Sequence, residues 1–424
     1  MMPLVFAATM SLSLDQAIAT GLQRNIDYRT AIAQTAFVRG ELTAARSQRY
    51  PSISLADSHQ TQSAGSIPQL TLPVPNGSGG YTTETIALAA TTTDTLAGTA
   101  SLALFRGGAI SGSIGQATAQ YAAAVASAEA TRADTVARVT EAYFTLAAAR
   151  ADDQVAADAL AVQEQNVALA KKRVDAGASP RAYLLQQQLS EANARTNKID
   201  ADNAVTVANA ALLDVLDLTS GTAIVPTEAL ERTYPVFALD ELQKQAHEQR
   251  PELRAAQSAV EAAAFAVRIA RSGWFPTVAV NATESNTRPA VLGAPQPQLV
   301  ATLLATWRLF DGGLTLGNVQ AAQAGVDEAN LQLEGLRKNI DLDVEQSYDD
   351  YEAALARIDA AKSAKAIAAE NARVAKLRFA NGVGTALELS DATVQDTQAQ
   401  SGYIRAQARA RIALATLLRA SGAL

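Results

Sequence analysis

The chain has 424 residues, a formal charge of −7 and no cysteine. The lack of cysteine excludes a disulfide scaffold, a thiolate metal site, a cysteine nucleophile and a lipid-modified N-terminal cysteine. The acidic balance argues against general nucleic-acid binding. With only His59 and His247, no nucleotide loop and no nucleophile elbow, the sequence predicts no enzyme, no cofactor and no metal site. A membrane-spanning helix needs about 20 consecutive apolar residues, and the sequence contains no such stretch.

The sequence contains two copies of one plan. The offset between copies is 205 positions for the pairs Phe105 and Phe310, Arg173 and Arg378, Gly177 and Gly382. Upstream it is 225 positions for the pairs Leu14 and Leu239, Arg46 and Arg271, Pro51 and Pro276. The difference of 20 falls between the proline and the Phe-x-Gly-Gly motif, so the first copy has the longer loop there. Both copies read helix, strand, loop, strand, long helix, turn, helix.

The chain begins with an apolar stretch, residues 1–11, which we interpret as an export-signal remnant or a disordered start. Repeat 1 covers residues 12–217: a helix, strands at about 51–60 and 96–105, a long helix over 109–175 and a return helix. Residues 60–94, rich in Gly, Ser, Thr and Pro, predict a long exposed loop. A linker over 218–238 follows. Repeat 2 covers 239–424, with a helix, strands at about 276–285 and 298–309, a long helix over 314–380 and a return helix.

The long helices predict an extended molecule. Residues 109–175 contain no proline, and no glycine after Gly115. At about 1.5 Å per residue such a helix spans roughly 100 Å. A globular domain rarely needs a helix of that length, whereas a coiled-coil tube does.

The four strands have the length and pattern of membrane-spanning β-strands. In the last one, Leu299, Leu303 and Trp307 fall on one face and Thr302 and Thr306 on the other. Four strands cannot close a barrel, and an open edge in lipid leaves backbone groups unpaired at a cost of several kcal/mol each. Several chains must therefore contribute.

Each repeat changes from strand to helix at a glycine pair, namely Gly107 and Gly108, then Gly312 and Gly313. Aromatic residues lie near the strand ends, where the aromatic girdle of a membrane barrel would sit: Tyr50, Trp274, Phe275 and Trp307. The alternative interpretation is that these aromatic residues are ordinary core or turn residues.

Three motifs carry a family resemblance: Leu-Phe-Asp-Gly-Gly at 309–313, Arg-Phe-x-x-Gly at 378–382 and Leu-Asp-x-Ala at 14–17. Together with the doubled plan they resemble the TolC family of outer-membrane efflux proteins, over residues 12–420. The resemblance implies a mainly α fold with transmembrane β-strands. A homotrimer would place four strands per chain in a twelve-stranded β-barrel, continued by a long periplasmic α-helical barrel.

The resemblance also implies a function. The trimer would be the outer-membrane exit duct of a tripartite efflux or type I secretion system in a Gram-negative bacterium, extending into the periplasm. It would conduct substrates passively from an inner-membrane pump and a periplasmic adaptor. The alternatives are a soluble coiled-coil scaffold and an outer-membrane pore that works without an adaptor.

The helical turns would form the periplasmic tip. By position, the resemblance puts an acidic gate at Glu388 and Asp391, although Thr385 and Glu388 also fit a capping box. Phe379 stands where a hydrogen-bonding Tyr can occur and Tyr183 where an Asp can, so we expect closure by packing and acid rings rather than by salt bridges. The adaptor would dock on small turn residues: Gly177, Ala178, Ser179, Gly382, Val383, Gly384 and Thr385.

Overall fold

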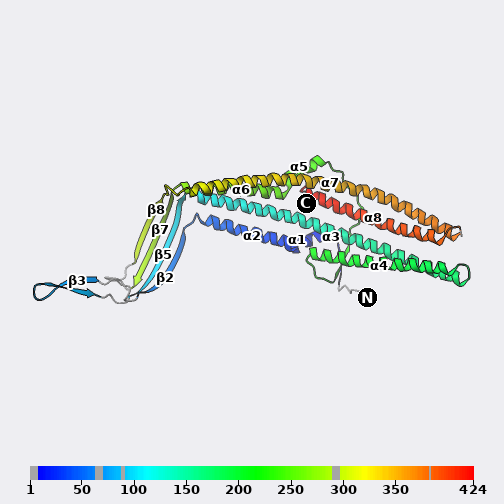
Figure 1. Ribbon diagram of the computed structural model, residues 1–424, viewed down its shortest axis with the longest axis horizontal. Coiled ribbons are helices and arrows are strands. Elements are labelled where there is room, and N and C mark those ends of the chain that lie inside the picture. The colour runs from blue at the N-terminus through cyan, green and yellow to red at the C-terminus, as the bar shows by residue number, and fades with distance from the viewer. Residues whose placement is uncertain (1–7, 63–69, 87–90, 289–296, 382) are drawn as a thin grey trace. The chain divides into compact units, whose positions relative to one another are not determined.

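The computed structural model describes residues 8–62, 70–86, 91–288, 297–381 and 383–424 (Figure 1). The chain divides into two compact units. The sheet unit comprises residues 38–121 and 259–329, and the helical unit comprises the described parts of 1–37, 122–258 and 330–424. Two long helices, α3 (Ala109–Asp175) and α7 (Leu314–Ala380), begin in the sheet unit and end in the helical unit.

The sheet unit contains one four-stranded antiparallel sheet with the order β2-β5-β7-β8. Its strands are β2 (Ser52–Gln62), β5 (Thr91–Arg106), β7 (Thr277–Arg288) and β8 (Gln298–Thr306). The predicted final strand reached residue 309; it ends at Thr306 because Trp307 to Gly313 turn the corner into α7. The two hairpins meet at the β5–β7 joint, so strands from both halves of the chain form one sheet.

The two faces of this sheet differ in polarity. Pairing across the sheet puts Ile53, Ala100, Ala282 and Ala301 in one row, and that face also carries Leu55, Leu299 and Leu303. The opposite face carries serines and threonines, including the hydrogen-bonded pair Ser52 and Ser101. Among the described residues nothing covers the apolar face, since Ile53 and Leu299 are 82% and 71% exposed. An exposed apolar face of this kind is suited to contact with lipid or with another molecule.

A second hairpin stands where the sequence predicted only a long loop. Strands β3 (Leu70–Pro75) and β4 (Tyr81–Ile86) pair antiparallel. Their turn is closed by Asn76, whose side-chain oxygen accepts a 2.7 Å hydrogen bond from the Gly80 N–H. Prolines at 73 and 75 are compatible with strands here because each strand of a two-stranded hairpin has an unpaired side. The predicted strand ends at 60 and 96 also extend, to Gln62 and Thr91.

The helices match in length between the two halves. Helices α3 and α7 each have 67 residues, and the return helices α4 (Arg181–Val215) and α8 (Ala386–Ala420) each have 35. Shorter helices precede each long one: α1 (Leu14–Arg24) and α2 (Ile26–Ser47), then α5 (Leu239–Gln249) and α6 (Pro251–Arg271). None of the helices in the described ranges is long and apolar enough to cross a membrane.

The start of the chain and the linker form a short parallel sheet that the sequence analysis did not predict. Strand β1 (Ala8–Leu12) pairs with β6 (Thr222–Pro226). Residues 8–11 are therefore neither disordered nor separate from the fold, while residues 1–7 lie outside the described residues. The sheet is anchored because Leu12 and Ile224 are buried and the Asn209 side chain bonds the β6 backbone on both sides, to Thr222 O and Ile224 N.

Two buried tyrosines hold this region to the long helices. The Tyr143 hydroxyl on α3 donates to Leu12 O at 2.9 Å and accepts from the N–H groups of Thr227 and Glu228 at 3.0 and 3.1 Å. Its ring belongs to one hydrophobic cluster, around α1, α3, α4 and β6. Tyr351 on α7 belongs to the other, around α5, α7 and α8, and donates to Pro235 O in the linker at 2.7 Å. The linker is thus fixed at both of its ends.

Candidate functional site

The far end of the helical unit consists of two helical turns, one in each half of the chain. In the first, Gly177 has a φ of +67°, a conformation that L side chains rarely adopt, so this glycine ends α3. Pro180 is the N-cap residue of α4, which begins at Arg181. In the second turn Gly382 lies outside the described residues.

The rest of the second turn requires a glycine for a different reason. The N–H groups of Val383 and Gly384 both donate to Arg378 O, at 3.0 and 3.1 Å. A Cβ at Gly384 would lie 3.0 Å from the Arg378 Cβ and 3.0 Å from the Phe379 nitrogen. Gly384 therefore lets the turn fold back tightly, while Val383 stays 70% exposed at its surface.

An aromatic contact joins the two hairpins near these turns. The rings of Tyr183 on α4 and Phe379 on α7 lie with centroids 5.9 Å apart, and the Arg173 guanidinium on α3 lies 5.0 Å from the Phe379 centroid. Burial raises the pKa of Tyr183, an effect that Arg173 partly offsets. The two predicted gate residues Tyr183 and Phe379 therefore touch ring to ring, and Arg173 adds a cation–π contact to Phe379.

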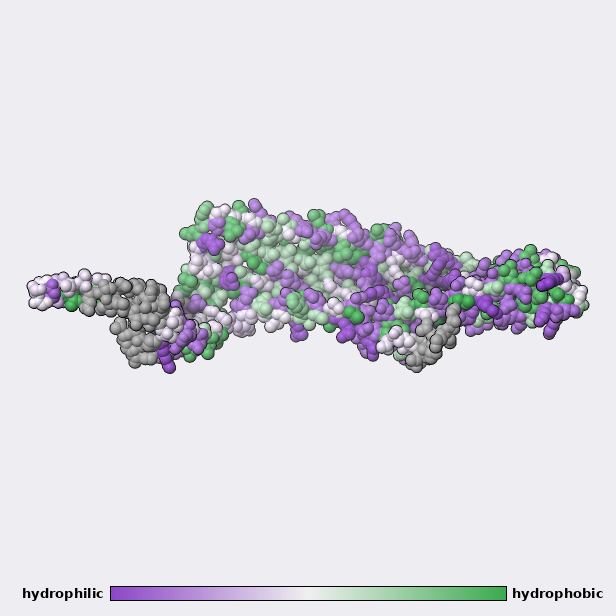
Figure 2. Space-filling view, turned by 60° about the horizontal axis from the view of Figure 1, so that its bottom comes forward, coloured by the Kyte–Doolittle hydropathy of each residue, from purple (hydrophilic) through white to green (hydrophobic). Residues whose placement is uncertain are grey.

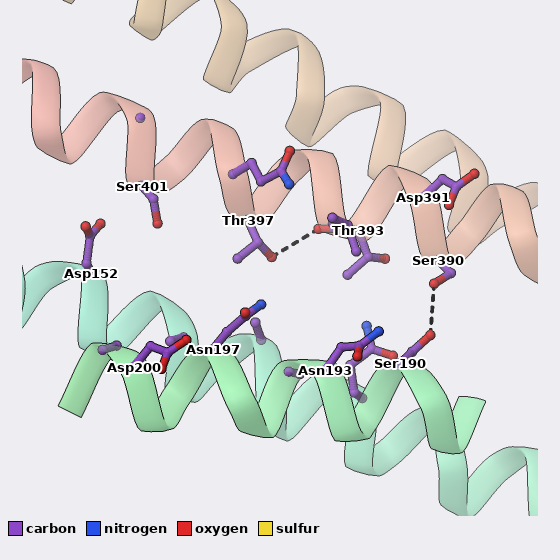
Figure 3. A pocket seen from close by; sticks show the side chains of 18 of the residues that line it. Asp152, Ser190, Asn193, Asn197, Asp200, Ser390, Asp391, Thr393, Thr397 and Ser401 are labelled. Atoms are coloured by element: carbon purple, nitrogen blue, oxygen red, sulfur yellow. Dashed lines mark hydrogen bonds between the residues drawn. The ribbon is translucent and has the colours of Figure 1, made fainter. Parts of the chain in front are cut away.

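Farther from the tip, a cavity of about 660 Å³ lies between α3, α4 and α8. Its lining combines small apolar residues with polar ones, and Figure 3 shows Asn193, Asn197 and Asp200 on one side facing Thr397 and Ser401 on the other. The side chains that meet across it are too small to fill the space. The first hairpin and α8 are therefore separated at this level by a gap with a mixed apolar and polar lining.

Two polar contacts bridge that gap. The hydroxyls of Ser190 on α4 and Ser390 on α8 are 3.1 Å apart and hydrogen-bonded (Figure 3). Arg405 on α8 donates through Nε to Asp152 Oδ2 on α3 at 2.8 Å. We call these two contacts the inter-hairpin ties. The sequence analysis did not identify them, because no pattern shows that α8 faces α3 and α4.

The two predicted gate acids differ in their contacts. Glu388 forms a capping box: its carboxylate accepts from the Thr385 N–H and its own N–H donates to the Thr385 hydroxyl, both at 3.2 Å. This is the alternative that the sequence left open for Glu388. Asp391 is exposed at the edge of the cavity, and in Figure 3 it points away from α4 while the neighbouring Ser390 points toward it.

The tip surface is both apolar and basic. The side chains of Leu185, Leu377, Val383 and Leu387 are exposed there, as are those of Lys172, Arg181, Lys376 and Arg378. At the hairpin end in Figure 2, on the right, hydrophobic and hydrophilic patches lie next to each other. A solvated helix end needs no such apolar surface, so this end has the character of an interaction surface.

At the other ends of the long helices, the strand-to-helix corners depend on their glycines. All four have positive φ: +59° and +92° at Gly107 and Gly108, and +67° and +91° at Gly312 and Gly313. A Cβ at Gly107 would lie 2.6 Å from Ser272 O. Asp311 caps α7 by accepting from the N–H groups of Gly313 and Thr315 and from the Thr315 hydroxyl. The hydrogen bonds from Thr315 lower the pKa of Asp311.

The predicted interface aromatics gather at this same edge of the sheet. Tyr50 and Phe275 precede the starts of β2 and β7, and Trp307 follows the end of β8. The Trp307 indole N–H donates to Trp274 O at 3.2 Å. All four side chains are about half exposed or more. They are turn aromatics in the chain, with enough exposed surface to contact a membrane interface as well.

The chain thus combines an amphipathic four-stranded antiparallel sheet with two helices of 67 residues each. The model of the family described as outer membrane efflux protein matches residues 17–216 and 242–423. The chain belongs to this family.

Individual proteins agree with that assignment. Protein CyaE of Bordetella pertussis is 27% identical over 420 residues, which cover 97% of this chain and 84% of that protein. Among solved structures, the outer membrane protein VceC of Vibrio cholerae has a TM-score of 0.77 at 21% identity and covers 96% of both chains. The open state of the MtrE outer membrane channel of Neisseria gonorrhoeae has a TM-score of 0.74 at 20% identity, with 96% of this chain and 88% of that one covered.

The family fixes the general function. The protein is an outer-membrane exit duct of the kind used by efflux and secretion systems, and the reading as a soluble coiled-coil scaffold is not supported. The family and its structural relatives are channels rather than enzymes. In the described ranges, no three His, Asp or Glu side chains lie together as metal ligands would.

Proposed function

We propose that three copies of the chain assemble into one duct, with twelve strands closing a barrel in the outer membrane of a Gram-negative bacterium. The observation that carries this proposal is the four-stranded sheet. Within the part of the chain that the structure describes, its apolar face is uncovered and its edge strands, β2 and β8, are unpaired on their outer sides. In lipid a free edge costs several kcal/mol for each unpaired backbone group, which closure between copies removes. The aromatic edge with Trp307 and Tyr50 then lies at one membrane interface.

The long helices continue the duct into the periplasm, with the two repeats giving each copy two hairpins. Exposed apolar side chains on α7, such as Leu331 and Ile367, support burial against a neighbouring copy. The matching lengths of α3 and α7, and of α4 and α8, support the internal repeat.

The hairpin tips form the gate in this proposal. The Tyr183–Phe379 contact and the inter-hairpin ties hold the α7–α8 hairpin against the α3–α4 hairpin in the closed state. Threefold symmetry would bring three copies of Asp391 into a ring of carboxylates, which attracts cations. Glu388 serves the helix cap in each copy and adds its charge nearby.

The tips also dock a periplasmic adaptor, which connects the duct to an inner-membrane pump. Their exposed leucines, Val383 and the small turn residues Gly177 and Ala178 allow another helical hairpin to approach closely. The duct itself moves substrates passively, since neither repeat carries a nucleotide-binding motif.

Native mass spectrometry of the detergent-solubilised protein, followed by planar-bilayer conductance with and without divalent cations, tests the proposal. We expect a trimer of about three chain masses that forms small, cation-selective currents blocked by divalent ions. A monomer or dimer without channel activity would refute the trimeric duct. A trimer whose currents prefer anions would refute the acidic gate alone.

A further inference from the structure

The edges of the sheet determine which strands must meet between copies. Strands β2 and β8 are the edge strands, and in the described residues no strand pairs with their outer sides. Each strand runs antiparallel to its neighbour, so β2 and β7 point one way and β5 and β8 the other. A β8 strand placed beside the β2 strand of a second copy is therefore antiparallel, like the three joints already present.

The two hairpins of the chain pair in the same register. Ser52 lies opposite Ser101. Adding the repeat offsets, 225 for the first strand and 205 for the second, gives positions 277 and 306. Thr277 does lie opposite Thr306. The pair Gln60 and Thr93 likewise becomes Ser285 and Gln298, which are partners as well. Residues at equivalent positions of the repeat are therefore paired with each other in both hairpins.

The β5–β7 joint is the one place where the second strand of one hairpin meets the first strand of the next. The joint between copies also brings together the second strand of one hairpin and the first strand of another. The strands are β8, which corresponds to β5 in the repeat, and β2, which corresponds to β7. We infer that the joint between copies repeats the β5–β7 register, so that Leu304 of one copy lies opposite Ser58 of the next. This inference rests on the proposed trimer and adds the residue pairing to it.

The observed pairs of the β5–β7 joint predict the residue pairs of the joint between copies. Thr99 with Thr283 becomes Leu304 with Ser58, and Ala97 with Ser285 becomes Thr302 with Gln60. On the apolar face, Gly98 with Glu284 becomes Leu303 with His59, and Ala100 with Ala282 becomes Ala305 with Asp57. We call this set of pairs the seam.

The seam keeps the two faces of the sheet continuous. Leu303 shares the apolar face with Leu299, and His59 shares it with Ile53 and Leu55. A slip by one residue would turn one strand over and place its apolar side chains on the polar face. A slip by two residues keeps the faces, so only the pairing itself distinguishes the seam from that alternative.

Side chains at paired positions touch on the polar face of the template joint. The hydroxyls of Thr95 and Thr287 are 3.3 Å apart, and those of Thr99 and Thr283 are 3.4 Å apart. Positions directly opposite in an antiparallel pair have Cβ atoms about 4.5–5.5 Å apart, against roughly 7–8 Å for positions offset by two residues. Cysteines at the seam positions therefore lie near the separation that a disulfide needs, and offset ones do not. The chain has no cysteine of its own, so every disulfide would come from the introduced pair.

The test uses four double variants of the full chain, purified as trimers in detergent and oxidised. Two are in register, Ser58→Cys with Leu304→Cys and Gln60→Cys with Thr302→Cys. The other two exchange partners, Ser58→Cys with Thr302→Cys and Gln60→Cys with Leu304→Cys, and represent two-residue slips in opposite directions. Each cysteine thus occurs once in each set, so accessibility and reactivity are matched.

We expect the in-register variants to run as covalent trimers on non-reducing gels, with loss of the monomer band, and the exchanged variants to remain monomers. Reductant should restore monomers in all cases. Preferential cross-linking of an exchanged pair, or equal cross-linking of both sets, would overturn the seam while native mass spectrometry still shows a trimer. If the reduced protein is not a trimer, the proposed duct fails and the seam fails with it.

Discussion

The tie between Arg405 and Asp152 allows a quantitative test of the proposed gate. Replacing Arg405 by alanine removes a 2.8 Å ion pair between α8 and α3, in which the side chains are 64% and 15% exposed. Because the arginine is mostly in water, the pair is worth about 0.5–1 kcal/mol rather than the value of a buried pair. If the three copies open together, the closed state loses about 1.5–3 kcal/mol in total, which is roughly a 10- to 160-fold rise in the ratio of open to closed channels.

The upper part of that range is favoured by the environment of Asp152. Its Oδ1 atom is already buried without a hydrogen-bond partner. Removal of Arg405 leaves a largely buried carboxylate with no counter-ion, and a buried charge without a partner costs more than the lost attraction alone. The closed arrangement is the one that buries this carboxylate, so the variant should favour opening.

Single-channel recording of the trimer in planar bilayers measures the open probability. The matched control is Arg195→Ala, which removes a 2.8 Å ion pair with Glu191 on α4 of similar exposure and a 4.0 Å contact with Glu164 on α3, both inside the first hairpin. This control cannot change a contact between hairpins, so its open probability should equal that of the wild type. If Arg405→Ala behaves like Arg195→Ala, the inter-hairpin tie does not hold the gate.

Four further outcomes are expected. Asp391→Ala should increase conductance and weaken block by divalent cations, whereas Glu388→Ala should leave both nearly unchanged and cost α8 about 1 kcal/mol through loss of its cap; equal effects of the two would contradict the assignment. Val383→Trp should abolish efflux in cells while the trimer mass stays the same, and loss of the trimer would show that the turn is only structural. Tyr143→Phe removes three hydrogen bonds to β1 and the linker, so a loss of about 2 kcal/mol should speed hydrogen exchange in β6 about 30-fold; unchanged exchange would disprove that role. Burial raises the pKa of Tyr351 to about 12. The contribution of Tyr351 to the free energy of unfolding should therefore be complete below pH 10 and fall progressively toward pH 12, because the tyrosine ionises first in the unfolded chain; a free energy of unfolding with the same alkaline pH dependence in Tyr351→Phe would contradict this.

The sequence was informative where one pattern persists over many residues. Helix α3 could be located because an Ala-rich segment without proline runs from the Gly108 corner to the Gly177 turn. The strands could be recognised because period-two alternation ends at a glycine pair. The family was recognised by resemblance, on three motifs and the doubled plan, and the general function was what that resemblance implied; the family match supports both.

Contacts between distant elements could not be read in the same way. Strand β1 has only five residues and is recognisable only through its partner, β6. The β3–β4 hairpin contains prolines that usually argue against strands. Arg405 and Asp152 are 253 positions apart on two long helices whose exposed faces look alike in sequence. Such pairings depend on how helices pack, which composition does not record.

The parallel pairing of β1 with β6 has a consequence for the order of folding. Ala8 and Thr222 are 214 positions apart, and closing a loop of that size costs about 5 kcal/mol in chain entropy. Once α3 and α4 have formed an antiparallel hairpin, the same two ends are already close and most of that cost has been met. Strand β1 is therefore expected to pair with β6 only after helices α3 and α4 have formed. Until then the apolar side chain of Leu12, which is buried in the folded protein, is exposed to solvent.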